Sequence, residues 1–278
     1  MTDRSAQTNL QTYDAAEVAA HYAALEYLTP CEQLLFETYI KPGSAILDLG
    51  VGGGRTTAYL ANLASRYVGV DYSVAMIRAC QSKFPGLEFV VADAADLSAF
   101  SDNSFDVAVF AFNGIDYVLP QQARRACLKH LHRVLKPGGI LIFSSHNARA
   151  VLAPPRWNGE RLRRVARTFS SGSNILYWML LVILTSARSV LALCQSAAAS
   201  LFRLVRRIPS RVFWRGEGNL VDSVHGGLLT HYCTPERVIA ELEALHFQIE
   251  RVGNEYPRSS YRYATDWYYY VFAKPSDR

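Results

Sequence analysis

The sequence predicts an α/β protein built on a mostly parallel sheet that is covered by helices on both faces. Short apolar runs alternate with stretches of helical spacing, and a glycine-rich loop joins the first predicted strand to the helix that follows it. The chain has 278 residues, of which 50% are apolar and 19% are charged. This length and composition suit one large folded domain with an insertion and exclude a disordered chain.

Five apolar runs separated by helical segments make up the first part of the body. Each run is short and ends in glycine, aspartate or turn residues, as buried parallel strands do. Strands are predicted at 45–49, 67–70, 87–91, 105–110 and 140–143, and helices at 55–64, 74–83 and 121–135. The Lys-Pro-Gly-Gly segment at 136–139 is expected to stop the last of these helices and to form a turn.

The last part of the chain is expected to complete the sheet. Thr234 is the predicted N-cap of a helix over 235–245. Strands are predicted at 247–252 and 267–273. The short link between these two strands favours a hairpin, so the final strand should run antiparallel.

Charge is distributed unevenly along the chain. The formal net charge is +5, but residues 156–215 hold eleven arginines and a single acidic residue, Glu160, a net charge of +10. The 18 basic and 23 acidic residues elsewhere leave −5. We therefore divide the chain into four parts: an N-terminal helical arm (1–42), a core (43–149), a basic, apolar helical insert (150–228) and the C-terminal part of the core (229–278).

The spacing of the cysteines and the composition of the first residues indicate the cellular compartment. Five cysteines lie far apart and none forms a Cys-x-x-Cys pair, which disfavours a disulfide framework or a zinc site. The first residues are polar and lack the apolar core of a secretory signal. These features predict a cytoplasmic protein.

A glycine-rich loop, Gly50-Val-Gly-Gly-Gly54, follows the first predicted strand. Glycine permits a tight turn and the close approach of a ligand to the backbone. Because position 55 is arginine, the GxGxxG pattern of nicotinamide proteins is not met from Gly50. Asp48 would repel a dinucleotide phosphate and suits a cationic ligand. Asp71, at the end of the second strand, suits ribose hydroxyls, and Asp93, after the third, is placed to meet an adenine amino group.

Five segments carry a family resemblance. DLGVGGG, VGVDYS, VADAADL, FDVAVFAFNGIDYV and RVLKPGGILIF occur in the order and spacing of class I S-adenosylmethionine-dependent methyltransferases. The chain resembles this superfamily over about residues 40–147, and more loosely over the C-terminal helix and strands. The resemblance implies a Rossmann-like seven-stranded sheet of order 3-2-1-4-5-7-6 with strand 7 antiparallel and a helical insert after strand 5. It also implies S-adenosylmethionine as cofactor and S-adenosylhomocysteine as product.

The resemblance also implies roles around the cofactor. Asp48 would face its methionine end, and Asp71 would hold both ribose hydroxyls. A tyrosine of the arm, Tyr13 or Tyr22, either covers the sulfonium in a cation–π arrangement or only packs the arm on the body. The cofactor-binding candidates are Asp48, Gly50, Gly52, Gly54, Asp71, Tyr72, Met76, Asp93, Ala94, Phe110, Asn113 and Tyr22.

Methyl transfer from a sulfonium is an in-line displacement, so the protein must align the acceptor and, for a hydroxyl or amine, remove a proton. The candidate bases are His146, just past the fifth strand, and His231, where the chain re-enters the body, with His225 as a third. A structural role for His146 fits the sequence equally well. His231 is the weaker candidate, because a role in stabilising the junction with the insert also fits it. Phe112-Asn-Gly-Ile115 stands where amide and nucleobase N-methyltransferases carry Asn-Pro-Pro-Tyr, which favours oxygen as the methylated atom. No catechol-type metal cluster is evident, so we expect no metal.

Two main interpretations of the insert fit the sequence. Segment 174–208 joins an apolar run to a basic amphipathic pattern, as in a helix that lies on an anionic membrane surface. Arg188 disfavours a helix that spans the bilayer. A lid helix packed on the body or on a second subunit fits as well. Binding of nucleic acid is the minor alternative because the body is acidic.

We therefore expect a methyltransferase that O-methylates a small or lipid-linked acceptor, in the cytoplasm or at the inner face of a membrane. Two alternatives stay open. The first is a methyltransferase for a soluble sugar, polyketide or other small metabolite. The second is a non-catalytic protein that binds S-adenosylmethionine and whose insert binds a membrane or a partner.

Overall fold

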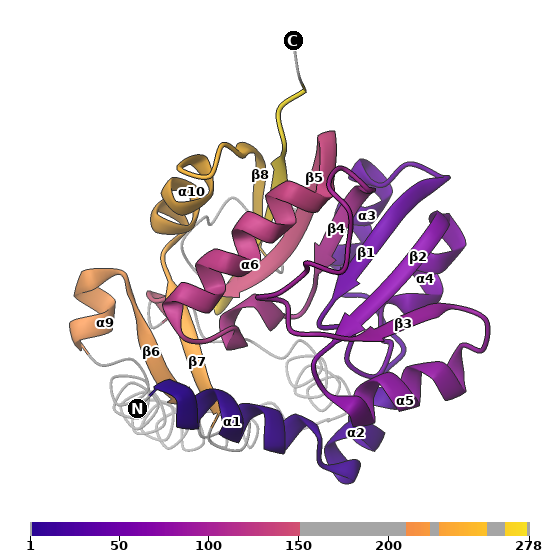
Figure 1. The fold of residues 1–278 in the computed structure, drawn as a ribbon. Helices are drawn as coiled ribbons and strands as arrows, with labels where there is room; N and C mark the ends of the chain where they lie inside the picture. The colour runs from indigo at the N-terminus through magenta and orange to yellow at the C-terminus, as the bar shows by residue number, and fades with distance from the viewer. Residues whose placement is uncertain (1, 151–209, 223–227, 255–264, 277–278) are drawn as a thin grey trace, which may run out of the picture.

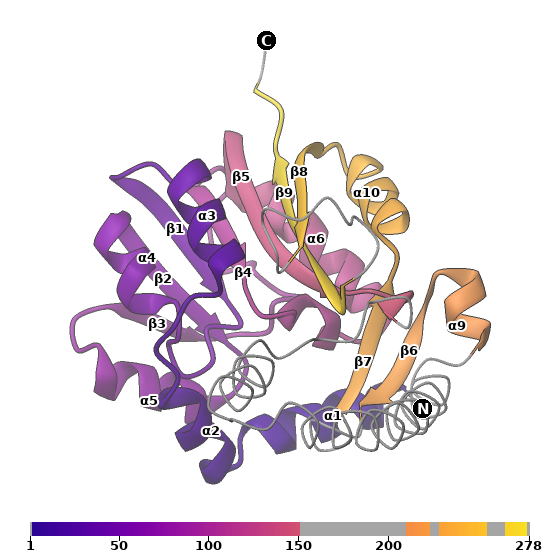
Figure 2. The same ribbon diagram turned by 180° about the vertical axis from the view of Figure 1, so that it is seen from behind.

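The computed structural model describes residues 2–150, 210–222, 228–254 and 265–276 (Figure 1). A central sheet carries helices on both of its faces, as the two opposite views show (Figures 1 and 2). Segment 174–208 and His225, for which the sequence analysis predicted roles, lie outside the described residues. Among the described helices, none combines the length and apolarity needed to cross a bilayer.

The central sheet has seven strands in the order β3-β2-β1-β4-β5-β9-β8. β9 runs antiparallel to both of its neighbours, whereas the pairs from β3 to β5 are parallel. The predicted order 3-2-1-4-5-7-6 with an antiparallel last strand is therefore confirmed. The strands are β1 (Ser44–Leu49), β2 (Ala64–Asp71), β3 (Glu88–Val91), β4 (Phe105–Phe110), β5 (Leu135–His146), β8 (Gln248–Asn254) and β9 (Trp267–Ala273).

Alternation of side chains along β1 divides the core into two layers. Ile46 packs on one face with residues of the helices α3, α4 and α5, whereas Leu47 and Leu49 pack on the other with residues of α6 and α10. All three side chains are fully buried, as expected for a strand covered on both faces. The helices are α3 (Pro30–Tyr39), α4 (Thr57–Leu63), α5 (Val74–Lys83), α6 (Gln121–Val134) and α10 (Pro235–Glu243).

The Lys-Pro-Gly-Gly segment was predicted wrongly as a turn. Helix α6 ends at Val134, and β5 begins at Leu135, so residues 136–139 belong to the strand. Gly138 has a φ of 78°, and the register between β4 and β5 shifts between Phe105 and Val107. The segment therefore forms an irregular stretch at the start of β5, which glycine accommodates without leaving the sheet.

Two helices of the N-terminal arm, α1 (Thr2–Tyr13) and α2 (Ala16–Ala23), run along the lower edge of the molecule in Figure 1. α1 contacts β7 and α2 contacts α5, so the arm spans the edge at which the parallel strands end. The arm thus closes one side of the region where α/β sheets bind their ligands.

A small hairpin faces the arm at the same edge. β6 (Glu217–Asp222) and β7 (Leu228–Cys233) pair antiparallel in a separate two-stranded sheet, preceded by the short helix α9 (Ser210–Arg215). The sequence analysis did not anticipate these strands. Thr234 follows the hairpin as the N-cap residue of α10, as predicted, but its side chain makes no capping hydrogen bond.

Candidate active site

A cavity of about 440 Å³ lies at the carboxyl ends of the parallel strands, beside the arm. Its wall contains most of the residues that the sequence analysis selected: Tyr22, Gly50, Gly52, Asp71, Tyr72, Met76, Asp93, Ala94, Phe110, Asn113 and His146. Asp48, Gly54 and His231 are not part of the wall. The fold therefore gathers segments that are distant in the sequence into one site.

The glycine loop is shaped by two neighbours. Gly50 and Gly52 have φ values of 58° and 54°, which glycine adopts without strain. A Cβ on Gly50 would lie 2.6 Å from Cε2 of Phe110, so no side chain fits between the loop and β4. A Cβ on Gly53 would lie 2.2 Å from the backbone nitrogen of Ala23. The end of α2 therefore packs directly on the loop.

Asp48 lies behind this loop rather than at the cavity. Its buried carboxylate accepts hydrogen bonds from Thr56 Oγ1 at 2.9 Å and from the Tyr67 hydroxyl at 2.8 Å. Burial raises the pKa of Asp48 to about 6. In this structure the side chain joins the first strand to the segment before α4, a different position from the one expected beside the methionine end of the cofactor.

Asp71 stands at the end of β2, in the cavity wall. Its two oxygens accept hydrogen bonds from the backbone nitrogens of Gly52 and Ser73, each at 2.9 Å. Burial raises the pKa of this carboxyl to about 6. Each carboxylate oxygen has further lone pairs, so Asp71 can still accept hydrogen bonds from the two hydroxyls of a ribose.

Asp93 follows β3 and lies in the same wall. Its Oδ1 accepts a hydrogen bond from the backbone nitrogen of Ala95 at 2.8 Å, which fixes the turn after the strand. Asp71 and Asp93 thus come from adjacent strands and meet at one end of the cavity, as their positions after consecutive parallel strands predicted.

Tyrosines form a continuous aromatic wall where the arm meets the body. The ring of Tyr13 lies 5.9 Å from that of Tyr22, 6.2 Å from Tyr72 and 5.8 Å from Tyr117, measured between centroids, and all four side chains line the cavity. Burial raises the pKa of Tyr13 and of Tyr22, which keeps both hydroxyls protonated at neutral pH. Both arm tyrosines predicted from the sequence are therefore at the site.

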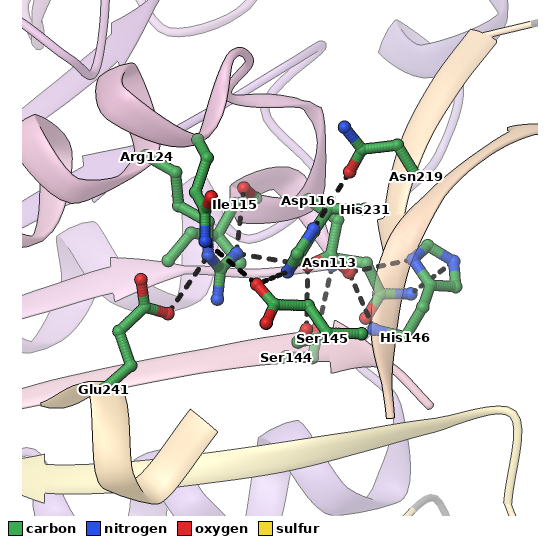
Figure 3. A network of polar contacts seen from close by, with 12 residues as sticks. Asn113, Ile115, Asp116, Arg124, Ser144, Ser145, His146, Asn219, His231 and Glu241 are labelled. Carbon is green, nitrogen blue, oxygen red and sulfur yellow. Dashed lines mark hydrogen bonds and ion pairs between the residues drawn. The ribbon is translucent and has the colours of Figure 1, made fainter. Parts of the chain in front are cut away.

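His146, the last residue of β5, lies in the cavity wall and is held by the buried carboxylate of Asp116 (Figure 3). Its Nδ1 is 2.8 Å from Oδ2 of Asp116, and its backbone nitrogen donates to the same oxygen at 2.6 Å. Nε2 lies 3.3 Å from Nδ2 of Asn113. Asp116 itself is completely buried.

The sequence analysis missed Asp116 and the ion pairs behind it. Arg124 on α6 places Nη1 3.3 Å from Oδ1 of Asp116 and Nε 3.4 Å from Oε2 of Glu241 on α10 (Figure 3). Ser145 Oγ donates to the same Asp116 oxygen at 2.7 Å. In the sequence, Asp116 is marked only as an acidic residue in an otherwise apolar stretch after the fourth strand. Its partners become evident only in the folded structure.

His231 lies in the hairpin, away from the cavity. Its Nδ1 is 3.0 Å from Oδ1 of Asn219 on the neighbouring strand. Burial, with a smaller effect of the charge of Arg124, lowers the pKa of His231 to about 4, so the ring is neutral at pH 7. The next residue, Tyr232, contacts a residue of the cavity wall, because its ring centroid lies 5.0 Å from that of His146.

The cavity fits the cofactor that the resemblance implies. The hydroxyl of Tyr72 and Oδ1 of Asn113 are buried there without a hydrogen-bond partner. Together with Asp71 and Asp93 they form a set rich in acceptors, which suits the hydroxyl and amino groups of S-adenosylmethionine. Among the residues that the structure describes, no cluster of His, Cys, Asp and Glu side chains could hold a metal ion.

Comparison with known proteins gives matches in sequence and in fold. Residues 46–139 match the family model described as a methyltransferase domain. A demethylmenaquinone methyltransferase of Paenarthrobacter aurescens is 32% identical over 118 residues, which cover 42% of this chain and 44% of that protein. The match therefore spans less than half of that relative.

Two solved structures show how widely the fold is used. The 1,6-didemethyltoxoflavin-N1-methyltransferase of Burkholderia thailandensis, with S-adenosylhomocysteine bound, is 14% identical at a TM-score of 0.56 and covers 98% of this chain and 87% of its own. The 4+2 cyclase SpnF is 15% identical at a TM-score of 0.56 and covers 98% of this chain and 97% of its own. At such identities the likeness shows the fold alone. Residues 46–139 thus match a methyltransferase domain, and the sheet order and the glycine loop support the resemblance of this chain to class I S-adenosylmethionine-dependent methyltransferases.

Proposed function

We propose that this protein is an S-adenosylmethionine-dependent methyltransferase that methylates a hydroxyl group of a small or lipid-linked acceptor. One observation carries the proposal: His146, hydrogen-bonded to Asp116, opens on the same cavity as Asp71 and Asp93. Methyl transfer to a hydroxyl needs the cofactor and the acceptor to be aligned and the hydroxyl proton to be removed. Carboxylates that would hold the nucleoside and a histidine that would take the proton lie in the wall of this one cavity.

The residues at the ends of β2 and β3 would hold the nucleoside. Asp71 would accept hydrogen bonds from the ribose hydroxyls, and Asp93 would face the adenine, with Met76 in the same cavity wall. Tyr13 and Tyr22 would cover the sulfonium, where aromatic faces attract a positive charge. When bound, the cofactor supplies an electrophilic methyl group on that sulfonium.

His146 would serve the acceptor. The acceptor hydroxyl would replace the amide of Asn113 at Nε2 and donate its proton there, while its oxygen forms the new bond to the methyl carbon. The bonding pair of the broken carbon–sulfur bond remains on sulfur. The long contact of 3.3 Å between Asn113 and Nε2 is a weak hydrogen bond that an acceptor can displace.

The charge of the wall favours an uncharged acceptor. Among the described residues that line the cavity, Arg55 is the only lysine or arginine. Both of its terminal nitrogens bind the Glu32 carboxylate, at 2.6 and 2.8 Å, so its charge is already balanced. An acceptor with a phosphate or carboxylate at the reacting end would find no unpaired cation in this part of the wall.

We retain a membrane surface as a proposed partner for segment 174–208. An exposed side chain beside that segment supports it: Trp214 on α9 is 78% exposed and stands between Arg211 and Arg215. Tryptophan flanked by arginine suits the interface of an anionic bilayer. We expect binding to anionic vesicles at low salt that weakens in a deletion of 174–208 and in Trp214→Ala. Equal binding by all three proteins would contradict the proposal.

Labelled methyl transfer to a panel of acceptors tests the function. The panel contains demethylmenaquinone, because a relative is named demethylmenaquinone methyltransferase. It also contains phenols, soluble sugars and polyketides. We expect a methylated product that wild type forms and His146→Ala forms at least about 100-fold more slowly. Cofactor binding without any product would favour the non-catalytic alternative, and product only from sugars or polyketides would favour the alternative of a soluble metabolite.

A further inference from the structure

We propose that Asp116 is a positioning residue that holds His146 with its proton on Nδ1, so that the unprotonated Nε2 faces the cavity. The catalytic use of this arrangement rests on the function proposed above, but the position of the proton does not. The inference follows from the partners of the Asp116 oxygens and is not a property of either residue alone.

Apart from the ring of His146, three donors in the described part of the chain form hydrogen bonds to the carboxylate oxygens of Asp116. Oδ2 accepts from the backbone nitrogen of His146 at 2.6 Å, and Oδ1 accepts from Ser145 Oγ at 2.7 Å and from Arg124 Nη1 at 3.3 Å. A backbone N–H and a guanidinium can only donate, and they act on different oxygens. Both oxygens therefore accept hydrogen bonds, and the Arg124 guanidinium beside them favours the ionised carboxylate over the neutral acid.

The tautomer of His146 follows from this arrangement. Its Nδ1 lies 2.8 Å from Oδ2 of Asp116, and against an ionised carboxylate Nδ1 makes this hydrogen bond only as the donor. A neutral imidazole holds one proton, and Nε2 is then a bare acceptor. The amide nitrogen of Asn113, at 3.3 Å from Nε2, faces this lone pair with a donor.

A buried ion pair keeps the carboxylate charged. The side chains of Asp116 and Arg124 are 0% and 1% exposed, so ionised Asp116 would be costly without a partner cation. Glu241 on α10 binds the other side of Arg124, and His231 on β7 adds no charge at neutral pH because its pKa is lowered to about 4. Tyr117 and Tyr232 complete the surroundings of the ring.

The proposed role of the network in the reaction is to act through His146. When Nε2 takes the proton of the acceptor hydroxyl, the imidazolium lies against a carboxylate that is already in place and need not reorganise. Asp116 stays ionised and accepts no proton, as in hydrolase triads in which a buried aspartate orients histidine. Asp116 lines no part of the cavity, which makes it a positioning residue and not a catalytic one.

Nitrogen-15 NMR of the histidine rings tests the proposal directly, without any acceptor. The protein has seven histidines, and His146→Asn identifies the signal of His146. We expect the neutral ring of His146 in wild type to show a protonated Nδ1 and a bare Nε2. A proton on Nε2 of the neutral ring in wild type would overturn the proposal, whatever the variants do.

Asp116→Asn supplies the second comparison. The side-chain amide places an NH2 donor among the groups that donate to Asp116, so we expect the His146 ring of the folded variant to lose its uniform tautomer. Asp102→Asn is the control, because it changes an exposed carboxylate that is paired with Arg133. We expect this control to leave the tautomer of His146 unchanged. A uniform Nδ1-protonated ring in folded Asp116→Asn would contradict the role of Asp116. Should this variant fail to fold, the wild-type tautomer still decides.

Activity then separates this proposal from the function itself. With an acceptor in hand, we expect Asp116→Asn to lower kcat roughly 100-fold in the wild-type background and to have little effect in His146→Ala. Equal losses in both backgrounds would mean that Asp116 acts only on the fold. The expected tautomer without any methylated acceptor would leave the positioning intact and would count against the proposed methyltransferase reaction.

Discussion

The side chain of Asn9 and the backbone of Leu229 exchange two hydrogen bonds, although 220 positions separate them. Asn9 Nδ2 donates to the carbonyl oxygen of Leu229 at 3.0 Å, and the Leu229 nitrogen donates to Asn9 Oδ1 at 3.1 Å. Asn9 is 1% exposed, so this amide replaces a backbone partner for the strand β7. The arm is thereby fixed to the hairpin at one end and, through Ala23, to the glycine loop at the other.

Gly53→Ala is expected to displace the arm. The added Cβ would lie 2.2 Å from the Ala23 nitrogen, a distance that only a shift of α2 can relieve. We expect faster hydrogen exchange over residues 2–24 and roughly tenfold weaker binding of S-adenosylhomocysteine, since Tyr13 and Tyr22 leave the cavity with the arm. In a protein lacking residues 2–24, the same substitution should have no further effect; an equal loss there would show that it acts on the loop itself.

Cofactor binding is expected to weaken in acid because of Asp71. Its pKa in the folded protein is raised to about 6, so the carboxylate that would accept the ribose hydrogen bonds is lost as the pH falls through that value. We expect the Kd of S-adenosylhomocysteine to rise by up to about tenfold per pH unit below pH 6. Asp48→Asn should retain this dependence, because Asp48 lies outside the cavity wall, whereas Asp71→Asn should flatten it.

Acid is also expected to lower the stability of the fold, through His231. Its pKa is lowered from 6.5 to about 4 on folding, so the unfolded chain binds a proton in this window and the folded protein does not. This contribution to the free energy of unfolding is present above the unfolded pKa and is lost as the pH falls to about 4, a change of about 3 kcal/mol.

Denaturant titrations of wild type and His231→Gln between about pH 4 and pH 7 measure this contribution. The buried carboxyls of Asp48 and Asp71 act with the reverse sign, since their raised pKa values favour the folded state below about pH 6. The difference between the two proteins isolates His231. Parallel curves would mean that the ring titrates alike in both states.

Arg124→Met is expected to destabilise the fold strongly. The substitution leaves the completely buried Asp116 carboxylate without its cation, a change that typically costs about 3–5 kcal/mol. Arg66→Met is the matched control, because Arg66 pairs with Glu88 at 3.5 Å with both side chains 48% exposed, and such a pair contributes at most about 1 kcal/mol. Chemical denaturation of both variants checks this, and similar losses would refute the special role of Arg124.

The features of the site that could be predicted are those set by where a residue stands relative to the end of a strand. Asp71 and Asp93 follow adjacent parallel strands, so the sheet topology alone brings them together. Asp48 precedes its loop by only two residues, but its carboxylate is bound by Thr56 and Tyr67 and is not part of the cavity wall. The end of the first strand could be predicted from the sequence, but the hydrogen-bond partners of the Asp48 side chain could not.

Contacts across long separations could not be predicted in this way. Asp116 meets His146 across 30 positions, and Arg124 meets Glu241 across 117. Each of these residues alone is an ordinary charged side chain in an element of the expected kind. The buried network that orients His146 exists only because α6, β5 and α10 pack together, and no spacing in the sequence marks it.

Calorimetric titration of S-adenosylmethionine and S-adenosylhomocysteine into wild type and Asp71→Ala tests the central claim most directly. The account predicts micromolar binding of both ligands to wild type and a loss of at least about 100-fold, roughly 3 kcal/mol, in a variant that remains folded. Absence of binding to folded wild type, or equal binding by both proteins, would contradict the assignment of this cavity to the cofactor.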